Sequence, residues 1–157
     1  MRTTAPNLKL ELLKELYSLN CGDQAFYKNA SSFAKRILFQ SFFKRLSRQK
    51  QSFCTALEIL ILDEKTEDES RDFFNRSQKS SKNCDSLNCF HYYDFKWNKN
   101  KIIKECFKKE SKALERYNRA LKQFEDEEIS YLLELHQTQI QRIIREMKVM
   151  GVNRFLV

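Results

Sequence analysis

Glycine and proline, the residues that most often form tight turns, are almost absent from this chain of 157 residues. It contains two glycines, Gly22 and Gly151, and one proline, Pro6. A fold of many short strands would need these residues at its turns. The sequence therefore favours long helices with few connections, and its length fits a single domain over residues 1–157.

Apolar residues recur at alternating intervals of three and four, which is the pattern of a helix with one buried face. The pattern predicts helices over about residues 8–31, 34–62, 99–124 and 127–150. We expect the first turn near Ser31 and Ser32, because serine favours caps. Gly151 is expected to stop the last helix. The residues expected to face inward are Leu12, Leu16, Leu19, Phe26, Ala30, Phe33, Ile37, Phe39, Phe42, Phe43, Leu46, Phe53, Leu57, Ile59, Leu60, Ile103, Cys106, Ala113, Tyr117, Leu121, Phe124, Ile129, Leu133, Ile140, Ile143 and Met147.

The segment over residues 63–98 breaks the helical pattern. It begins with an acidic run, Asp63 to Glu69, and ends with an aromatic-rich stretch, Phe90 to Trp97. A solvated linker seldom collects so many aromatic residues, so we expect this end to pack on the helices as a short helix or turn. The chain is therefore predicted to be all-α, an antiparallel four-helix bundle with a long crossover between its second and third helices.

The composition of the chain indicates where the protein is located and in what state its cysteines are. No apolar stretch approaches the length of a membrane span, and the first residues lack the pattern of a secretory signal. We therefore expect a cytoplasmic protein with no membrane partner. Five cysteines, an odd number, favour reduced thiols over a disulfide framework. Cys21, Cys54 and Cys106 lie on predicted helices and are expected to be small core or near-core residues.

Three positions that the periodicity assigns to the core hold polar residues, namely Asp23, Glu110 and His136. Each should fall near the middle of its helix, so the three side chains could meet in one layer of the bundle. Buried carboxylates and imidazoles are costly unless they are paired or bind a cation. The layer is therefore either a hydrogen-bonded network or a metal site for iron or manganese.

The set of ligands that a two-metal site requires favours the hydrogen-bonded network over the metal site. A di-iron or di-manganese bundle site needs a Glu from each of two helices and a Glu-x-x-His motif from each of the other two. The chain has no Glu-x-x-His motif, and its second helix offers only Gln49 or Lys50 near the middle of the inner face. We therefore expect an incomplete di-metal site and no bound cofactor.

In the crossover, Cys84, Cys89 and His91 would begin a zinc site, although Cys-x2-Cys spacing is absent.

One flank of the second helix is predicted to be electropositive. The formal net charge is +8, and no acidic residue lies between Asp23 and Glu58. Lys44, Arg45 and Arg48 are the candidate polyanion-binding residues, because a helix that carries cations and no acids can follow phosphates. Charge runs are more often solvated faces, so nucleic acid is not the expected partner. The basic residues in this interval are Lys28, Lys35, Arg36, Lys44, Arg45, Arg48 and Lys50.

Three stretches carry a family resemblance. They are KIIKECFKKESKALERYNRALKQFEDEEISYLLELHQTQIQRI, LKELYSLNCGDQAFYKNA and FFKRLSRQKQSFCTALEIL. In these stretches the chain resembles a bacterial family of ferritin-like four-helix bundles classed as a domain of unknown function. The residues that match its pattern are Gly22, Tyr27, Ala30, Tyr92, Asp94, Phe95, Lys96, Ile103, Glu105, Cys106, Glu110, Ala113, Tyr117, Ala120 and Leu121.

The resemblance implies a ferritin-like topology and, from some relatives, an association with stress response, but no established activity. The chain departs from the family between Ser77 and Asn88, where a Ser-, Lys- and Asn-rich stretch replaces a glycine-rich crossover. Our leading hypothesis is a non-catalytic structural or interaction protein that forms a homodimer or higher oligomer through an aromatic surface. The alternatives are a metal-binding oxidase or metal-storage module, and a module that binds nucleic acid or another polyanion.

Overall fold

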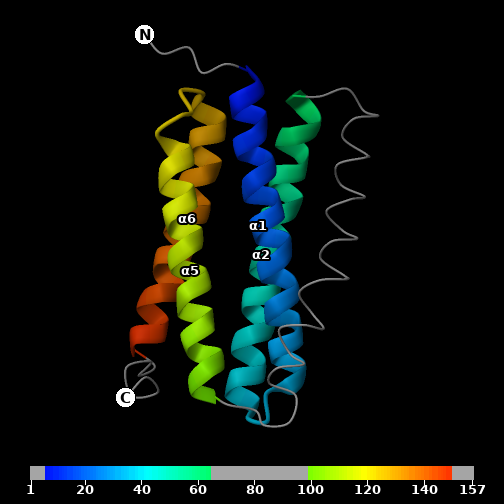
Figure 1. Cartoon of the computed structure of the whole chain (residues 1–157), viewed down its shortest axis with the longest axis vertical. Helices are drawn as coiled ribbons and strands as arrows, with labels where there is room; N and C mark the ends of the chain where they lie inside the picture. The colour runs from blue at the N-terminus through cyan, green and yellow to red at the C-terminus, as the bar shows by residue number, and fades with distance from the viewer. Residues whose placement is uncertain (1–5, 65–98, 150–157) are drawn as a thin grey trace. The chain divides into compact units, whose positions relative to one another are not determined.

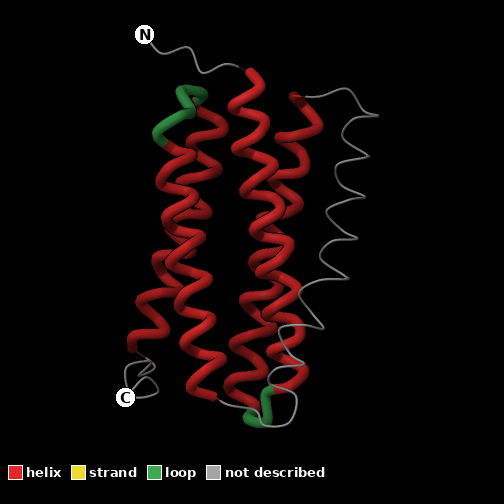
Figure 2. Tube along the Cα trace, in the orientation of Figure 1, coloured by secondary structure: helices red, strands yellow, loops and turns green. Residues whose placement is uncertain are grey.

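The structure is a computed structural model that describes residues 6–64 and 99–149. In these two ranges all regular structure is helical, and there is no strand (Figure 1, Figure 2). The helices are α1 (Pro6–Phe33), α2 (Ile37–Glu64), α5 (Lys99–Leu121) and α6 (Glu127–Val149). The prediction of an all-α architecture is confirmed for the described residues.

The chain divides into two compact units, which are described separately. One holds the hairpin of α1 and α2 from Leu13 onward, and the other holds α5 and α6 together with the start of α1. Four helices are compatible with a helical bundle. The crossover and its aromatic end lie outside the described residues, as does Gly151, so the ferritin-like topology stays a prediction.

A short turn, residues 34–36, joins α1 to α2. The backbone N–H of Ala34 donates to the carbonyl of Ala30 at 3.0 Å, which extends the helical pattern into the turn. The side-chain Nε2 of Gln40 donates to the carbonyl of Ala34 at 2.6 Å. This bond satisfies a carbonyl that the end of α1 would otherwise leave without a helical donor. The turn makes α1 and α2 antiparallel neighbours (Figure 1).

Contacts between α1 and α2 recur at increasing distances from this turn. Nearer the turn, the rings of Tyr27 and Phe43 stack with centroids 6.4 Å apart. Further out, the Sγ atoms of Cys21 and Cys54 lie 3.4 Å apart, and the Cys54 Sγ lies 4.0 Å from the carbonyl oxygen of Tyr17. The register of the hairpin therefore brings residues from the middle of α1 against residues from the middle of α2.

The expected turn at Ser31 and Ser32 was wrong, because α1 continues to Phe33. Both serine hydroxyls donate to the carbonyl of Lys28, at 2.7 and 3.2 Å. A serine that bonds back to the preceding turn fits within a helix and does not have to cap it. As a consequence α2 begins at Ile37, later than predicted, and it extends two residues further.

The α5–α6 turn is set by Asp126. Its carboxylate accepts the backbone N–H groups of Glu128 at 2.9 Å and of Ile129 at 3.2 Å, which is the pattern of an N-cap. Glu127 and Glu128 occupy the first turn of α6, where negative charge complements the helix dipole. The predicted start of the last helix is confirmed, whereas α5 ends at Leu121, before the predicted residue 124.

Most residues expected inward are buried, but three are exposed. Phe33 and Ile37 flank the α1–α2 turn at the end of the hairpin. Ile59 follows Leu57 by two residues, and two residues of helix rotate a side chain by about 200° to the opposite side. In α1 the buried face runs through Leu13 and its successors, so the face is displaced from the predicted one. The half-buried members of the prediction are Leu12, Leu19, Leu60 and Leu121.

No helix in the described ranges is both long enough and apolar enough to cross a membrane.

Candidate functional sites

Cys21 of α1 and Cys54 of α2 form a buried thiol pair. Both are free thiols, and their sulfur atoms are 3.4 Å apart. They keep exposed fractions of 8% and 7%. The prediction that these cysteines belong to the core is confirmed, but their proximity was not predicted.

The surroundings of the pair favour a negative charge on Cys21. The hydrogen bond from Cys54 and a second one from the Tyr17 hydroxyl lower the pKa of the Cys21 thiol. The same hydrogen bond and burial raise the pKa of Cys54. Burial raises the pKa of Tyr17. These shifts favour the arrangement in which Cys54 and Tyr17 keep their protons and donate to the Cys21 sulfur.

Charged side chains of the same hairpin act on the pair. The carboxylate of Glu58 raises the pKa of Cys21, in opposition to the two hydrogen bonds. Asp23 raises the pKa of Cys54, and the ammonium of Lys50 lowers it. A positive and a negative charge within electrostatic reach of one thiol make this the most polar part of the described α1–α2 core.

Lys50 was named among the basic residues of the second helix and also as a residue near the middle of its inner face, and the structure places it inside. The residue is fully buried, and its ammonium lies 5.3 Å from the centroid of the Phe53 ring. Asp23, in contrast, is buried as predicted. A lysine and an aspartate in the core of one hairpin are compatible with folding because each interacts with other groups there.

The α5–α6 unit has a polar core contact of its own. The Tyr117 hydroxyl and the Nδ1 atom of His136 lie 2.8 Å apart, and the two rings meet edge to face with centroids 5.5 Å apart. Glu110 is fully buried two turns before Tyr117 on the same face of α5. The predictions that Glu110 and His136 are inward-facing are confirmed, and Tyr117 joins them as a residue that sequence reasoning had treated as apolar.

The common layer of Asp23, Glu110 and His136 stays a prediction, because Asp23 belongs to the α1–α2 unit and the other two to the α5–α6 unit. Across residues 6–64 and 99–149, no group of three or more His, Cys, Asp or Glu side chains is arranged to hold a metal ion. The zinc-site candidates Cys84, Cys89 and His91 lie outside the described residues.

Lys44, Arg45 and Arg48 are exposed on α2, as predicted. Arg48 lies one helical turn after Lys44, so their side chains are neighbours on one face. The guanidinium of Arg45 lies 5.5 Å from the centroid of the Phe42 ring, a cation–π contact that restricts its orientation. The three cations form a candidate surface for a polyanion.

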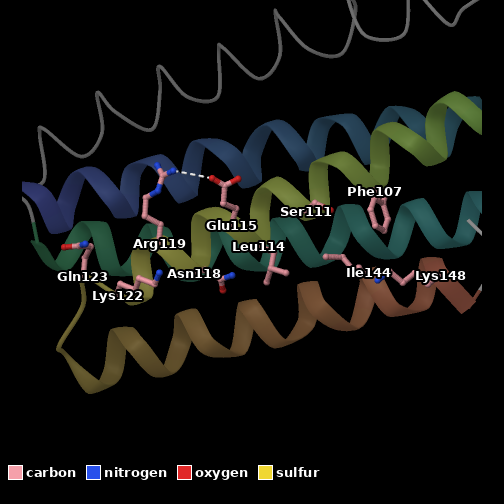
Figure 3. A pocket seen from close by; sticks show the side chains of 10 residues that line it. All are labelled: Phe107, Ser111, Leu114, Glu115, Asn118, Arg119, Lys122, Gln123, Ile144 and Lys148. Carbon is pink, nitrogen blue, oxygen red and sulfur yellow. Dashed lines mark hydrogen bonds and ion pairs between the residues drawn. The ribbon is translucent and has the colours of Figure 1, made fainter. Parts of the chain in front are cut away.

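A groove of about 620 Å³ runs along the α5–α6 hairpin (Figure 3). Apolar side chains of both helices contribute to its lining, and the Glu115 carboxylate is paired with the Arg119 guanidinium at 3.3 Å. Lys122 and Lys148 also line it, which makes the groove positively charged overall. The lining residues are Phe107, Ser111, Leu114, Glu115, Asn118, Arg119, Lys122, Gln123, Ile144 and Lys148.

Two exposed surfaces combine apolar and charged residues. The first, the basic tip, surrounds the α1–α2 turn, where Ile37 is 76% and Leu38 is 80% exposed. The second, the acidic start of α6, includes Tyr131, which is 64% exposed. The basic tip consists of Phe33, Lys35, Arg36, Ile37 and Leu38. The acidic start consists of Glu125, Asp126, Glu127, Glu128, Tyr131 and Leu135.

Comparisons with protein families, with curated proteins and with solved structures found no match for this chain. The resemblance to a ferritin-like family therefore stays a prediction that rests on the residues named above.

Sequence reasoning missed the thiol pair. Cys21 and Cys54 lie on consecutive helices, and a short antiparallel turn pairs residues at similar distances from its centre. Counting outward from residues 34–36 places Cys54 opposite Tyr17, one helical turn before Cys21, so the count alone does not identify the pair. The burial of Lys50 had a weaker indication, since it falls in the apolar stripe of α2 between Leu46 and Phe53.

Proposed function

We propose that this protein is a non-catalytic interaction protein that associates with copies of itself. The observation that carries the proposal is the complementarity of two exposed surfaces, the basic tip and the acidic start of α6. Each offers bulky apolar side chains beside charges of one sign, and the two signs are opposite. The partner of the basic tip is therefore the acidic start of α6 on a second copy.

Apolar burial would supply most of the association energy. Covering a side chain such as Ile37 or Leu38 contributes about 1.5–3 kcal/mol. Opposite charges would set the orientation and speed the encounter, since electrostatic complementarity acts more on specificity and on-rate than on affinity. Two different surfaces meet in this contact, so the assembly is either a dimer in which the contact is made twice or a head-to-tail ring or filament.

Charge reversal provides the test. Lys35→Glu with Arg36→Glu reverses the basic tip, and Glu127→Lys with Glu128→Lys reverses the acidic start of α6. Sedimentation velocity should show assembly for the unchanged protein and monomers for each reversed protein alone. An equimolar mixture of the two reversed proteins should assemble again, because each then offers the complement of the other.

If assembly is restored in the mixture, its loss in each reversed protein alone was due to a specific contact and not to a loss of folding. Ile37→Ser with Leu38→Ser should abolish assembly in every combination, and far-UV circular dichroism of each variant checks its helix content. A protein that stays monomeric over the whole concentration range, or reversed variants that assemble as well as the unchanged one, would overturn the proposal.

The ferritin-like topology, the cytoplasmic location, the bacterial origin and the link to stress response belong to the same proposal. Two helical hairpins with buried polar residues at Asp23, Glu110 and His136 support the ferritin-like topology. An experimental structure that traces residues 63–98 tests the topology, because a ferritin-like chain must return along the length of the bundle before its third helix. Protein abundance in the source cells, with and without stress, tests the link.

Metal binding is the second candidate, and the Tyr117–His136 contact favours it. A metal-bound histidine usually has its other ring nitrogen held by a hydrogen bond, which orients the ring. Here the Tyr117 hydroxyl orients the imidazole through Nδ1, and the Glu110 carboxylate is buried in the same unit. Asp23 would have to join them to give three protein ligands.

Elemental mass spectrometry of the purified protein, before and after anaerobic loading with iron or manganese, tests this candidate. Stoichiometric metal that is lost in Glu110→Ala would support it. Protein that remains free of metal after loading would exclude an oxidase or storage role for these residues.

Polyanion binding is the third candidate and rests on the exposed cations of α2. Affinity for a nucleic acid or another polyanion should then fall steeply with salt concentration, because binding releases counterions. Lys44→Glu and Arg48→Glu should each weaken it. Affinity that ignores both salt and these substitutions would remove the candidate.

A further inference from the structure

We infer that Cys21 and Cys54 are a site of reversible oxidation, at which a peroxide converts the two thiols into an intramolecular disulfide between α1 and α2. The inference is independent of the proposed self-association. It rests on the 3.4 Å separation of the two sulfur atoms and on their placement on two antiparallel helices joined by a short turn.

The distance places the pair near the geometry of a bond. A disulfide requires a sulfur separation of about 2.05 Å, so the two atoms must approach by roughly 1.4 Å. The sulfurs already face each other, and closing the remaining gap requires side-chain rotation together with a shift of the helices. The described cysteine of the other unit, Cys106, has its Sγ 3.5 Å from the Sδ of Met147.

The roles of the two sulfurs differ. Only the thiolate attacks a peroxide, and hydrogen bonds from Cys54 and Tyr17 favour that form at Cys21. Cys54 keeps its proton while Cys21 is a thiolate, partly because of the Cys21 charge, so Cys54 does not attack the peroxide. Once Cys21 is a neutral sulfenic acid that charge is gone, and Cys54 can release its proton and act as the resolving thiol. The small exposed fraction of the pair admits hydrogen peroxide more readily than a bulky disulfide reagent.

The two steps balance as a two-electron oxidation. In the first, the Cys21 thiolate attacks one peroxide oxygen, the O–O bond breaks, and water leaves after taking up a proton, so that Cys21 becomes a sulfenic acid. In the second, the sulfur of Cys54 attacks the Cys21 sulfur, the S–O bond breaks, and a second water carries away the Cys54 proton and the hydroxyl. Two thiols and one peroxide thus give one disulfide and two waters.

The experiment uses the full chain, fully reduced and then treated with a small excess of hydrogen peroxide. After the remaining thiols are alkylated under denaturing conditions, proteolysis and mass spectrometry identify linked peptides. The expected product joins the peptides of Cys21 and Cys54, has lost the mass of two hydrogen atoms, and disappears on reduction with dithiothreitol. Oxidation should also raise the Tm, because the link constrains the unfolded chain.

Variants assign the roles. In Cys54→Ser the reaction should stop at a sulfenic acid on Cys21, which a dimedone probe traps. In Cys21→Ser neither product should form at residue 54, and Cys106→Ser is the matched control that should leave the linkage unchanged. Tyr17→Phe should slow the oxidation at neutral pH by roughly three- to tenfold, the effect of removing one hydrogen bond that stabilises the Cys21 thiolate.

The peptide map of the unchanged protein decides the proposal even where a serine variant fails to fold, and alanine variants then replace the serine ones. Two results would overturn it. The first is that Cys21 and Cys54 remain thiols while other cysteines of the chain are oxidised. The second is that either residue links to a different cysteine or to another copy of the chain.

Discussion

The two hairpins bury different kinds of side chain although both are pairs of antiparallel helices. In α1–α2, Phe43 is at the centre of an aromatic cluster, with ring centroids of Phe39, Phe42 and Tyr27 between 5.6 and 6.4 Å away. In α5–α6 the buried residues of α6 are mainly aliphatic, interrupted by His136. Polar groups are thus placed beside large apolar side chains in the first hairpin and within an aliphatic stripe in the second.

The difference shows how each hairpin accommodates polarity. The polar groups of α1–α2 surround a thiol pair, where they lower the pKa of Cys21 and raise the pKa of Cys54. Those of α5–α6 include a direct contact between Tyr117 and His136. Apolar packing should therefore dominate the stability of the first hairpin, and hydrogen bonding should matter more in the second.

The largest expected effect is at the aromatic cluster. Phe43→Ala removes a fully buried ring and should lower the free energy of unfolding by about 3–5 kcal/mol. Urea titration followed by circular dichroism measures the loss, and hydrogen exchange shows whether it is concentrated in α1 and α2. Ile59→Ala, at an exposed position of α2 outside the proposed contact surfaces, is the control with little expected effect. A loss below about 1 kcal/mol would contradict the importance of apolar packing in this hairpin.

A smaller effect is expected at the polar contact of α5–α6. Tyr117→Phe keeps the ring and removes the hydroxyl, so His136 loses a hydrogen-bond partner in the core at a cost of about 1–3 kcal/mol. The same urea titration measures it. Tyr131→Phe, which removes an exposed hydroxyl on α6, is the matched control. Unchanged stability in Tyr117→Phe would mean that the second hairpin does not depend on this hydrogen bond.

Alkaline pH should destabilise the α1–α2 hairpin under reducing conditions. Burial and hydrogen bonding raise the pKa values of Cys54 and Tyr17, so the unfolded chain loses these protons at a pH where the folded chain retains them. Stability due to Cys54 is then present below the unfolded pKa of about 8.5 and falls above it by about 1.4 kcal/mol per pH unit. Tyr17 adds a similar slope above about pH 10.

The lowered pKa of Cys21 acts in the opposite direction and at lower pH. The stability that Cys21 contributes is present at pH values above its pKa of about 8.5 in the unfolded chain. This stability is lost as the pH falls through the lower pKa of Cys21 in the folded chain. Urea titrations between pH 7 and pH 11 should therefore show a smaller alkaline loss in Tyr17→Phe than in the unchanged protein. Equal slopes in the two proteins would contradict the assigned direction for Tyr17.

The smallest expected effect is at the start of α6. Asp126→Ala removes the acceptor for two backbone N–H groups and should cost about 0.5–2 kcal/mol. Asp126→Asn, which can still cap the helix, is the matched control and should retain most of the stability. Thermal unfolding of the three proteins measures the difference. An alanine variant as stable as the asparagine one would show that the cap is dispensable.

The sequence predicted the helices of the described regions well where apolar spacing was regular. In α6 every residue expected inward is buried, and His136 was recognised as a polar residue on the same face. The prediction was less accurate around the α1–α2 turn, because the serines there bond back to the helix and do not cap it. Periodicity alone cannot distinguish these two uses of a serine hydroxyl.

The sequence by itself determined the helical class, the buried positions of Asp23, Glu110 and His136, and the exposure of the basic residues Lys44 and Arg48. These properties follow from local spacing and from the cost of burying charge. Only the tertiary structure showed that Cys21 faces Cys54 and that Tyr117 contacts His136. Such contacts depend on the register between helices, which turn geometry and side-chain rotamers decide together and which no single helix encodes.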